Sequence, residues 1–89
     1  MKVVVSRSGG VAGIGVTWEV RVDDQPDPDY WARFLEQLPW ESVETSEPQP
    51  DRYMYRIRFA PHEVVLGERQ VSGPWRELVD RVRTANDRS

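Results

Sequence analysis

Alternating apolar and polar residues predict four β-strands in this chain, arranged as two pairs. Residues 2–7 are rich in β-branched side chains, and residues 14–22 carry an apolar side chain at every second position. Residues 52–59 and 63–69 repeat this alternation farther along the chain. A period of two residues is typical of a strand with one buried face. The residues expected on the buried faces are Ile14, Val16, Trp18, Val20, Val22, Tyr53, Tyr55, Ile57, Phe59, Val64 and Leu66.

Two helices are predicted by apolar residues that recur at the spacing of one helix face. The first begins with Asp27 as N-cap and Pro28 at the first helical position, and it stops before Pro39. The second begins at residues 72–74, a Ser-Gly-Pro sequence. The apolar stripes are Trp31, Phe34, Leu35 and Leu38 in the first helix, and Trp75, Leu78, Val79 and Val82 in the second.

The order of these elements predicts an α+β fold of the form ββαββα. We expect a four-stranded antiparallel sheet with both helices packed on one face, built from two related ββα halves. Residues 1–84 would form a single domain and residues 85–89 a polar C-terminal tail. Residues 39–51 contain three prolines, four acids and no base, so they should be an extended connection anchored only by Trp40 and Val43.

Composition limits the kind of protein this chain can be. With 89 residues and no cysteine, it relies on apolar packing and not on disulfides. No apolar run approaches the roughly 20 residues that span a bilayer, and the first residues do not resemble a signal peptide, so a cytoplasmic location is expected. The net charge is -3, and residues 23–51 hold nine of the fifteen acids. This distribution argues against a general nucleic-acid binder.

The residues that usually carry catalysis or bind metals are scarce. The sole histidine, His62, follows Pro61 and is expected in a turn. A structural zinc site needs four nitrogen or sulfur ligands, and the acids between Asp23 and Asp29 lack the spacing of a calcium loop. We therefore predict no catalytic residue, no bound metal and no cofactor, and we expect that the protein is not an enzyme.

The face of the sheet opposite the helices provides one alternative function. It would carry mostly polar and basic side chains: Thr17, Glu19, Arg21, Arg52, Met54, Arg56 and Arg58. Its arginines could bind nucleic acid, as RNA-reading sheets do with exposed aromatic residues. By alternation, however, Tyr53 and Tyr55 share the buried face with Ile57. We therefore regard the arginine face mainly as a solvent-exposed surface of the sheet, and a nucleic-acid partner as the weaker alternative.

The connection between the first two strands combines glycines with apolar side chains. It consists of Gly9, Gly10, Val11, Ala12, Gly13 and Ile14, and we call it the tip. Glycine permits backbone angles that tight hairpins require. Phosphate-binding glycine loops lead into a helix, whereas this one leads into a strand. Two interpretations stay open here: Val11 and Ile14 fold back onto the core, or they contact a partner.

Three segments together resemble emfourin, a family of small bacterial inhibitors of thermolysin-like metallopeptidases. They are residues 6–14, residues 18–20 and residues 72–79, and the similarity extends over nearly the whole chain. The most useful motif is Arg-x-Gly-Gly followed by a small apolar pair, here Arg7, Gly9, Gly10, Val11 and Ala12. The resemblance implies competitive inhibition of a zinc peptidase by a protein that is not an enzyme and carries no metal of its own.

Thermolysin-like clefts accept an extended segment and favour a large apolar side chain after the scissile bond. Val11 or Ile14 could supply that side chain, and the peptidase zinc could be contacted by a backbone carbonyl, by Asp23 or by Asp24. As a third alternative, a non-catalytic adaptor would add residues 2–7 to the sheet edge of another protein. We expect a monomer, with no membrane partner.

Overall fold

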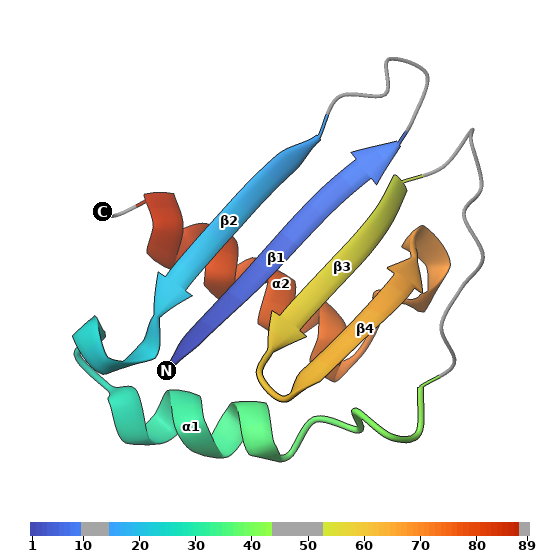
Figure 1. Cartoon of the computed structure of the whole chain (residues 1–89). Helices are drawn as coiled ribbons and strands as arrows, with labels where there is room; N and C mark the ends of the chain where they lie inside the picture. Colours follow the sequence, from blue (N-terminus) through green and yellow to red (C-terminus); the bar gives the residue numbers. More distant parts are fainter. Residues whose placement is uncertain (10–14, 44–52, 88–89) are drawn as a thin grey trace.

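The computed structural model describes residues 1–9, 15–43 and 53–87. The described residues form four strands and two α-helices (Figure 1). In chain order the elements are β1 Lys2–Gly9, β2 Val16–Arg21, α1 Pro28–Glu36, β3 Tyr53–Phe59, β4 His62–Gly67 and α2 Pro74–Asp87. Two 3-10 helices, η1 Val22–Asp24 and η2 Glu68–Gln70, follow β2 and β4. The predicted α+β class and the order ββαββα are confirmed.

The four strands form one antiparallel sheet in the order β2-β1-β3-β4. Val5 of β1 pairs with Trp18 of β2 on one side and with Ile57 of β3 on the other. The order is symmetric about the β1–β3 pair, as expected for two ββα halves. Because Val4 to Arg7 pair with β2 on one side and with β3 on the other, most of residues 2–7 is not an open edge, so the predicted strand addition there is wrong.

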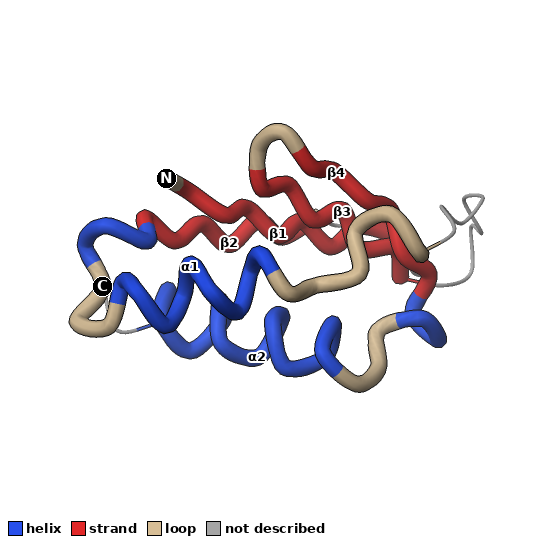
Figure 2. Tube along the Cα trace, turned by 90° about the horizontal axis from the view of Figure 1, so that it is seen from below, coloured by secondary structure: helices blue, strands red, loops and turns tan. Residues whose placement is uncertain are grey.

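Both helices lie on the same face of the sheet, as predicted (Figure 2). The hairpin end at which β1 leads toward β2 is not covered by either helix in the view perpendicular to the sheet (Figure 1). Helix α1 lies near the opposite end of the sheet, next to η1. In the part of the chain that the structure describes, no helix is long and apolar enough to cross a membrane.

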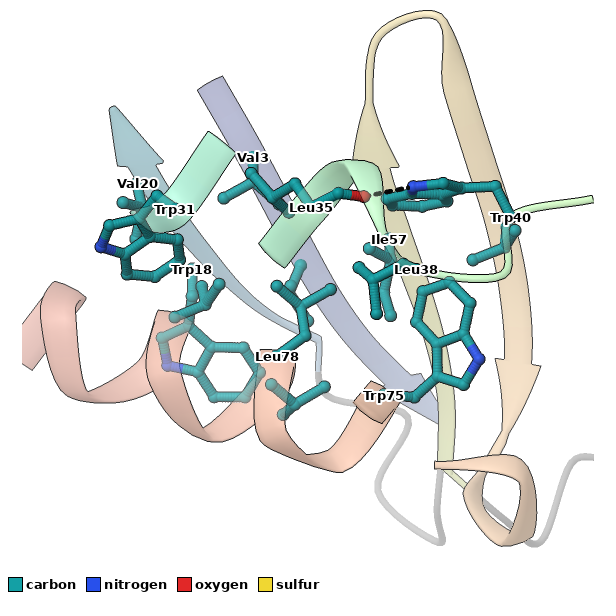
Figure 3. Packing of buried hydrophobic residues seen from close by; sticks show 14 of the residues in the cluster. Val3, Trp18, Val20, Trp31, Leu35, Leu38, Trp40, Ile57, Trp75 and Leu78 are labelled. Carbon is teal, nitrogen blue, oxygen red and sulfur yellow. Dashed lines mark hydrogen bonds between the residues drawn. The ribbon is translucent and has the colours of Figure 1, made fainter. Parts of the chain in front are cut away.

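The core between the sheet and the helices is entirely apolar (Figure 3). The alternation in the strands places one side chain in two against the helices, and the helix stripes meet them. Three tryptophans from β2, α1 and α2 add large buried surfaces, which a domain of this size needs. The buried residues are Val3, Val5, Trp18, Val20, Val22, Trp31, Leu35, Leu38, Trp40, Ile57, Val64, Leu66, Trp75, Leu78, Val79 and Val82.

The connection after α1 is anchored as predicted. Trp40 is buried, with its ring stacked on His62 at 5.0 Å between centroids and in edge contact with Trp75 at 5.1 Å. Val43 is half-buried and packs against the core. His62 is the first residue of β4, so the expectation that it lies in a turn is wrong. Its ring belongs to the aromatic cluster around Trp40.

Helix α2 is longer than the apolar pattern indicated. It continues to Asp87, so the residues predicted to begin a polar tail are helical as far as that position. Ala85 packs against the core, and Asn86 donates a side-chain hydrogen bond of 3.1 Å to the backbone carbonyl of Glu19. Contact with β2 thus extends the helix beyond its last buried residue, Val82.

Candidate functional site

The hairpin end of the sheet contains the first residue of the tip. Gly9 ends β1 with a φ of 102°, a backbone angle that favours glycine because it has no Cβ. Gly15 follows the tip, and the next residue, Val16, pairs with Arg7. Strands β1 and β2 therefore hold both ends of the tip. The predicted contact residues Gly10, Val11, Ala12, Gly13 and Ile14 lie outside the described residues.

The two acids predicted as alternative zinc contacts lie at the other end of the sheet. Asp23 and Asp24 belong to η1, which follows the end of β2 that pairs with Lys2. Seven residues of strand, about 23 Å at 3.3 Å per residue, separate Lys2 from Gly9. An Asp23 carboxylate oxygen is 2.7 Å from the amino group of Met1. The structure therefore does not bring these acids together with Gly9, the one described residue of the tip.

Next to the tip, four side chains form a group that we call the Arg7 cluster: Arg7, Trp18, Tyr53 and Arg83. The guanidinium carbon of Arg7 lies 4.7 Å from the centre of the Tyr53 ring and 5.5 Å from that of Trp18. Arg83 of α2 lies 5.2 Å from the same Trp18 ring. Cations at these distances from an aromatic ring interact favourably with its electrons. The cluster thus links β1, β2, β3 and α2 beside Gly9.

The alternation in β1 explains why an arginine stands here. Val3, Val5 and Arg7 point to the same face, and the two valines are fully buried whereas Arg7 is half-buried. The core face of β1 therefore changes from valine to arginine where the helices no longer cover the sheet. Gly9 pairs with Tyr53 and has no side chain, which leaves space for Arg7 to reach diagonally to that ring.

The charges of the Arg7 cluster have no carboxylate partner in the part of the chain that the structure describes. Within the described residues, neither Arg7 nor Arg83 forms an ion pair. The Arg7 Nε atom is buried and has no hydrogen-bond partner among those residues. A buried donor without an acceptor is unfavourable, and the Nε atom of Arg81 is in the same situation.

The sequence pattern did not predict this cluster. It assigned Tyr53 to the core, but the Tyr53 side chain is 38% exposed and Tyr55 is only half-buried. The core at this end of β3 begins at Ile57. A usable signal was present, because Arg7 occupies the position after Val3 and Val5 in the alternation of the first strand.

A second stack of arginine on aromatic rings lies on the helices. Arg81 of α2 lies 4.4 Å from the Tyr30 ring centre and 5.7 Å from that of Phe34. Unlike Arg7, it has a carboxylate nearby, with Nε 3.7 Å from Glu77. Arg81 and Trp31 also line an open groove of about 960 Å³ along α2. Tyr30 belongs to α1, so this stack lies away from the tip (Figure 1).

The arginine face of the sheet is exposed as predicted, but part of its charge is neutralised. Arg58 lies 3.1 Å and Arg56 3.9 Å from the carboxylate of Glu63, and Lys2 lies 3.9 Å from that of Glu19. Arg52 lies outside the described residues. Cross-strand pairs of this kind are typical of a solvated sheet face. Nothing in this arrangement favours the nucleic-acid alternative.

The described residues contain no group of three or more His, Asp or Glu side chains that could hold a metal ion. They also place His62 against Trp40, where its ring is part of the packing. Gly9 of the tip and the Arg7 cluster lie together at the hairpin end of the sheet.

The model of the Emfourin family matches residues 5–83 of the chain. These residues include β2, β3, β4, α1, most of α2 and all of β1 except its beginning. No curated protein matches the chain. No solved structure matches it either.

Proposed function

Because the chain belongs to the emfourin family, we propose that it is a protein inhibitor of a thermolysin-like zinc metallopeptidase. The family is consistent with a metallopeptidase-inhibitor role and implies a metallopeptidase as partner. The match over residues 5–83 is the single observation that carries this proposal. An inhibitor of this kind binds its target and needs no catalytic residue of its own.

The inhibition that we propose is competitive, with the tip in the active-site cleft. One feature supports this choice. The tip is joined at both ends to paired strands, with Arg7 opposite Val16, so its ends are held in place. A segment held at both ends loses little conformational entropy on binding, and it resists the distortion that cleavage requires.

Within the tip, Val11 or Ile14 would supply the apolar side chain for the specificity pocket of the peptidase. A contact with the peptidase zinc would come from a backbone carbonyl of the tip. The proposal leaves out Asp23 and Asp24, because η1 follows the end of β2 that pairs with Lys2, whereas Gly15 precedes the other end of that strand.

An inhibition titration tests the proposal. Purified protein is added to a thermolysin-like peptidase, and cleavage of a short peptide substrate is followed over time. We expect activity to disappear near an equimolar ratio, and the apparent Ki to rise in proportion to substrate concentration. Undiminished activity at a large excess of the protein, against several such peptidases, would contradict the inhibitor function and favour a non-catalytic adaptor.

A tip variant tests the site separately. Residues 9–14 are replaced by an Asn-Gly turn, which suits a two-residue hairpin between antiparallel strands. We expect this variant to keep a cooperative unfolding transition and to lose inhibition. If it inhibits as strongly as the parent, the tip is not the element that enters the cleft, although the family and its role would stand.

A further inference from the structure

The Arg7 cluster lies beside the tip on a part of the sheet that the helices leave open. Arg7 precedes Gly9 by two residues on the same face of β1, and Tyr53 pairs directly with Gly9. In Figure 1 the hairpin ends of β1, β2 and β3 extend beyond α2. Any protein that receives the tip in a cleft therefore brings the rim of that cleft close to these side chains.

The cluster consists of residue types that are common in protein interfaces, with Tyr53 and Arg83 exposed, Arg7 half-buried and Trp18 buried. Tryptophan, tyrosine and arginine are the residues most enriched among those that dominate binding energy in protein interfaces. The Arg7 guanidinium is already held against two rings, at 4.7 and 5.5 Å, and an ordered side chain loses less entropy when a partner binds. Tyr53, at 38% exposure, offers an accessible ring at the edge of the cluster.

The charge of the cluster indicates the chemistry of its partner. Arg7 and Arg83 lie within 5.5 Å of one Trp18 ring, and neither forms an ion pair within the described residues. Arg81, in the stack on the helices, is accompanied by Glu77. Two positive charges without a carboxylate partner among the described residues favour an acidic partner, because a carboxylate accepts hydrogen bonds from guanidinium groups in a fork geometry.

We propose that the Arg7 cluster is a second contact surface for the peptidase, and that it binds acidic side chains on the rim of the active-site cleft. Arg7 and Arg83 provide the charge and Tyr53 the ring contact. This inference rests on the proposed inhibitor function, which it extends from the tip to four described residues. Part of the affinity then depends on electrostatic attraction, which salt weakens.

Charge reversal at Arg83 tests the electrostatic part. Arg83→Glu is compared with Arg33→Glu, because both residues are exposed, both lie in helices and both substitutions change the net charge equally. Arg33 belongs to α1, away from the tip (Figure 1). We expect Arg83→Glu to raise the Ki about tenfold or more and to flatten its dependence on salt, with less than about a threefold effect of Arg33→Glu.

Truncation of the two exposed tyrosines tests the ring contact. Tyr53→Ala is compared with Tyr30→Ala, since each ring is partly exposed and each lies under a guanidinium, at 4.7 and 4.4 Å. Tyr53→Ala should raise the Ki about tenfold, with less than about a threefold effect of Tyr30→Ala. Urea unfolding of all four variants shows that each is folded under the assay conditions.

The parent protein, measured in the same series, separates the two proposals. A parent that inhibits, together with cluster variants that match their controls, would overturn the contact surface and leave the inhibitor function standing. The same holds if Tyr30→Ala and Arg33→Glu are the variants that weaken inhibition. A parent that inhibits none of the peptidases overturns both proposals.

Discussion

The indole Nε1 of Trp40 donates a buried hydrogen bond of 2.7 Å to the backbone carbonyl oxygen of Leu35. Leu35 lies in the last turn of α1 and Trp40 in the connection that follows, so this bond holds the chain against the helix that it has just left (Figure 3). The Trp40 ring also contacts His62 and Trp75. One side chain thus connects α1, β4 and α2.

Replacing Trp40 with phenylalanine should therefore lower the free energy of unfolding. We expect a loss of about 1–3 kcal/mol, from the hydrogen bond and from indole atoms that phenylalanine does not replace. Trp75→Phe is the matched control, because it removes similar ring atoms from the same cluster. The difference between the two urea-unfolding free energies should be close to the value of the hydrogen bond, about 1 kcal/mol. Equal losses would show that packing alone accounts for the effect.

Alanine substitutions at Gly9 and at Gly15, on either side of the connection between β1 and β2, should differ in their effect on stability. Gly9→Ala forces a Cβ onto a residue with φ of 102° and should cost at least about 1 kcal/mol of stability. At Gly15, which is not among the glycines with positive φ, a Cβ would be 3.7 Å from the Arg7 carbonyl oxygen, an ordinary contact. Gly15→Ala should change stability by less than about 0.5 kcal/mol or increase it slightly. Thermal unfolding of both variants checks the prediction, and equal destabilisation would contradict it.

The end of α2 provides a test of the domain boundary predicted at residue 84. A chain that ends at Thr84 loses the packing of Ala85 and the hydrogen bond from Asn86 to Glu19. We expect it to be about 1–2 kcal/mol less stable than a chain that ends at Asp87. Guanidinium unfolding of the two chains gives the comparison. If both unfold at the same denaturant concentration, residues 85–87 contribute nothing and the boundary stands.

A double substitution, Asp23→Asn with Asp24→Asn, should leave inhibition unchanged within about twofold. Both acids lie in η1, at the end of the sheet away from the tip, and the ion pair of Asp23 with Met1 is exposed. The loss of stability should be less than about 1 kcal/mol. The measurement is the Ki of this double variant, compared with the Ki of the tip variant. A large rise in Ki on loss of these carboxylates would bring the acids back as contacts of the peptidase.

Leu78→Ala should be the most damaging of these substitutions. Its side chain is fully buried between α2 and the sheet, and the cavity left behind costs about 2–5 kcal/mol. A domain of this size has about 5–15 kcal/mol of stability to lose. Urea unfolding should show a sharply lower midpoint. A loss below about 1 kcal/mol would mean that neighbouring side chains close the cavity.

The fold could be predicted because its signals are local. The alternation around Trp18 and Ile57 and the helical spacing from Trp31 to Leu38 each identify an element and its buried face. The strand order could not be predicted in this way, because the pairing of β1 with β3 joins residues about 50 positions apart. No local pattern indicates that pairing, and so the sequence alone predicts an available edge along residues 2–7.

The Arg7 cluster was missed for a related physical reason. Whether Tyr53 is buried depends on how far the helices reach along the sheet, and alternation gives the face of a residue without its distance from the core. The last turn of α2 could not be predicted from the sequence for a similar reason. Its stability comes from the contact of Asn86 with β2, which hydrophobic spacing does not register. The tip itself was identified from glycine and apolar residues, and its role stays a prediction.

The interior position of β1 also has a consequence for synthesis. A ribosome makes β1 and β2 first, and they can pair as a hairpin at once, but the second side of β1 has no partner until β3 has emerged. During that interval the nascent hairpin presents an unpaired edge beside Val3 and Val5, a surface prone to association with other chains. The acidic residues translated between α1 and β3 would then keep such early chains apart by repulsion.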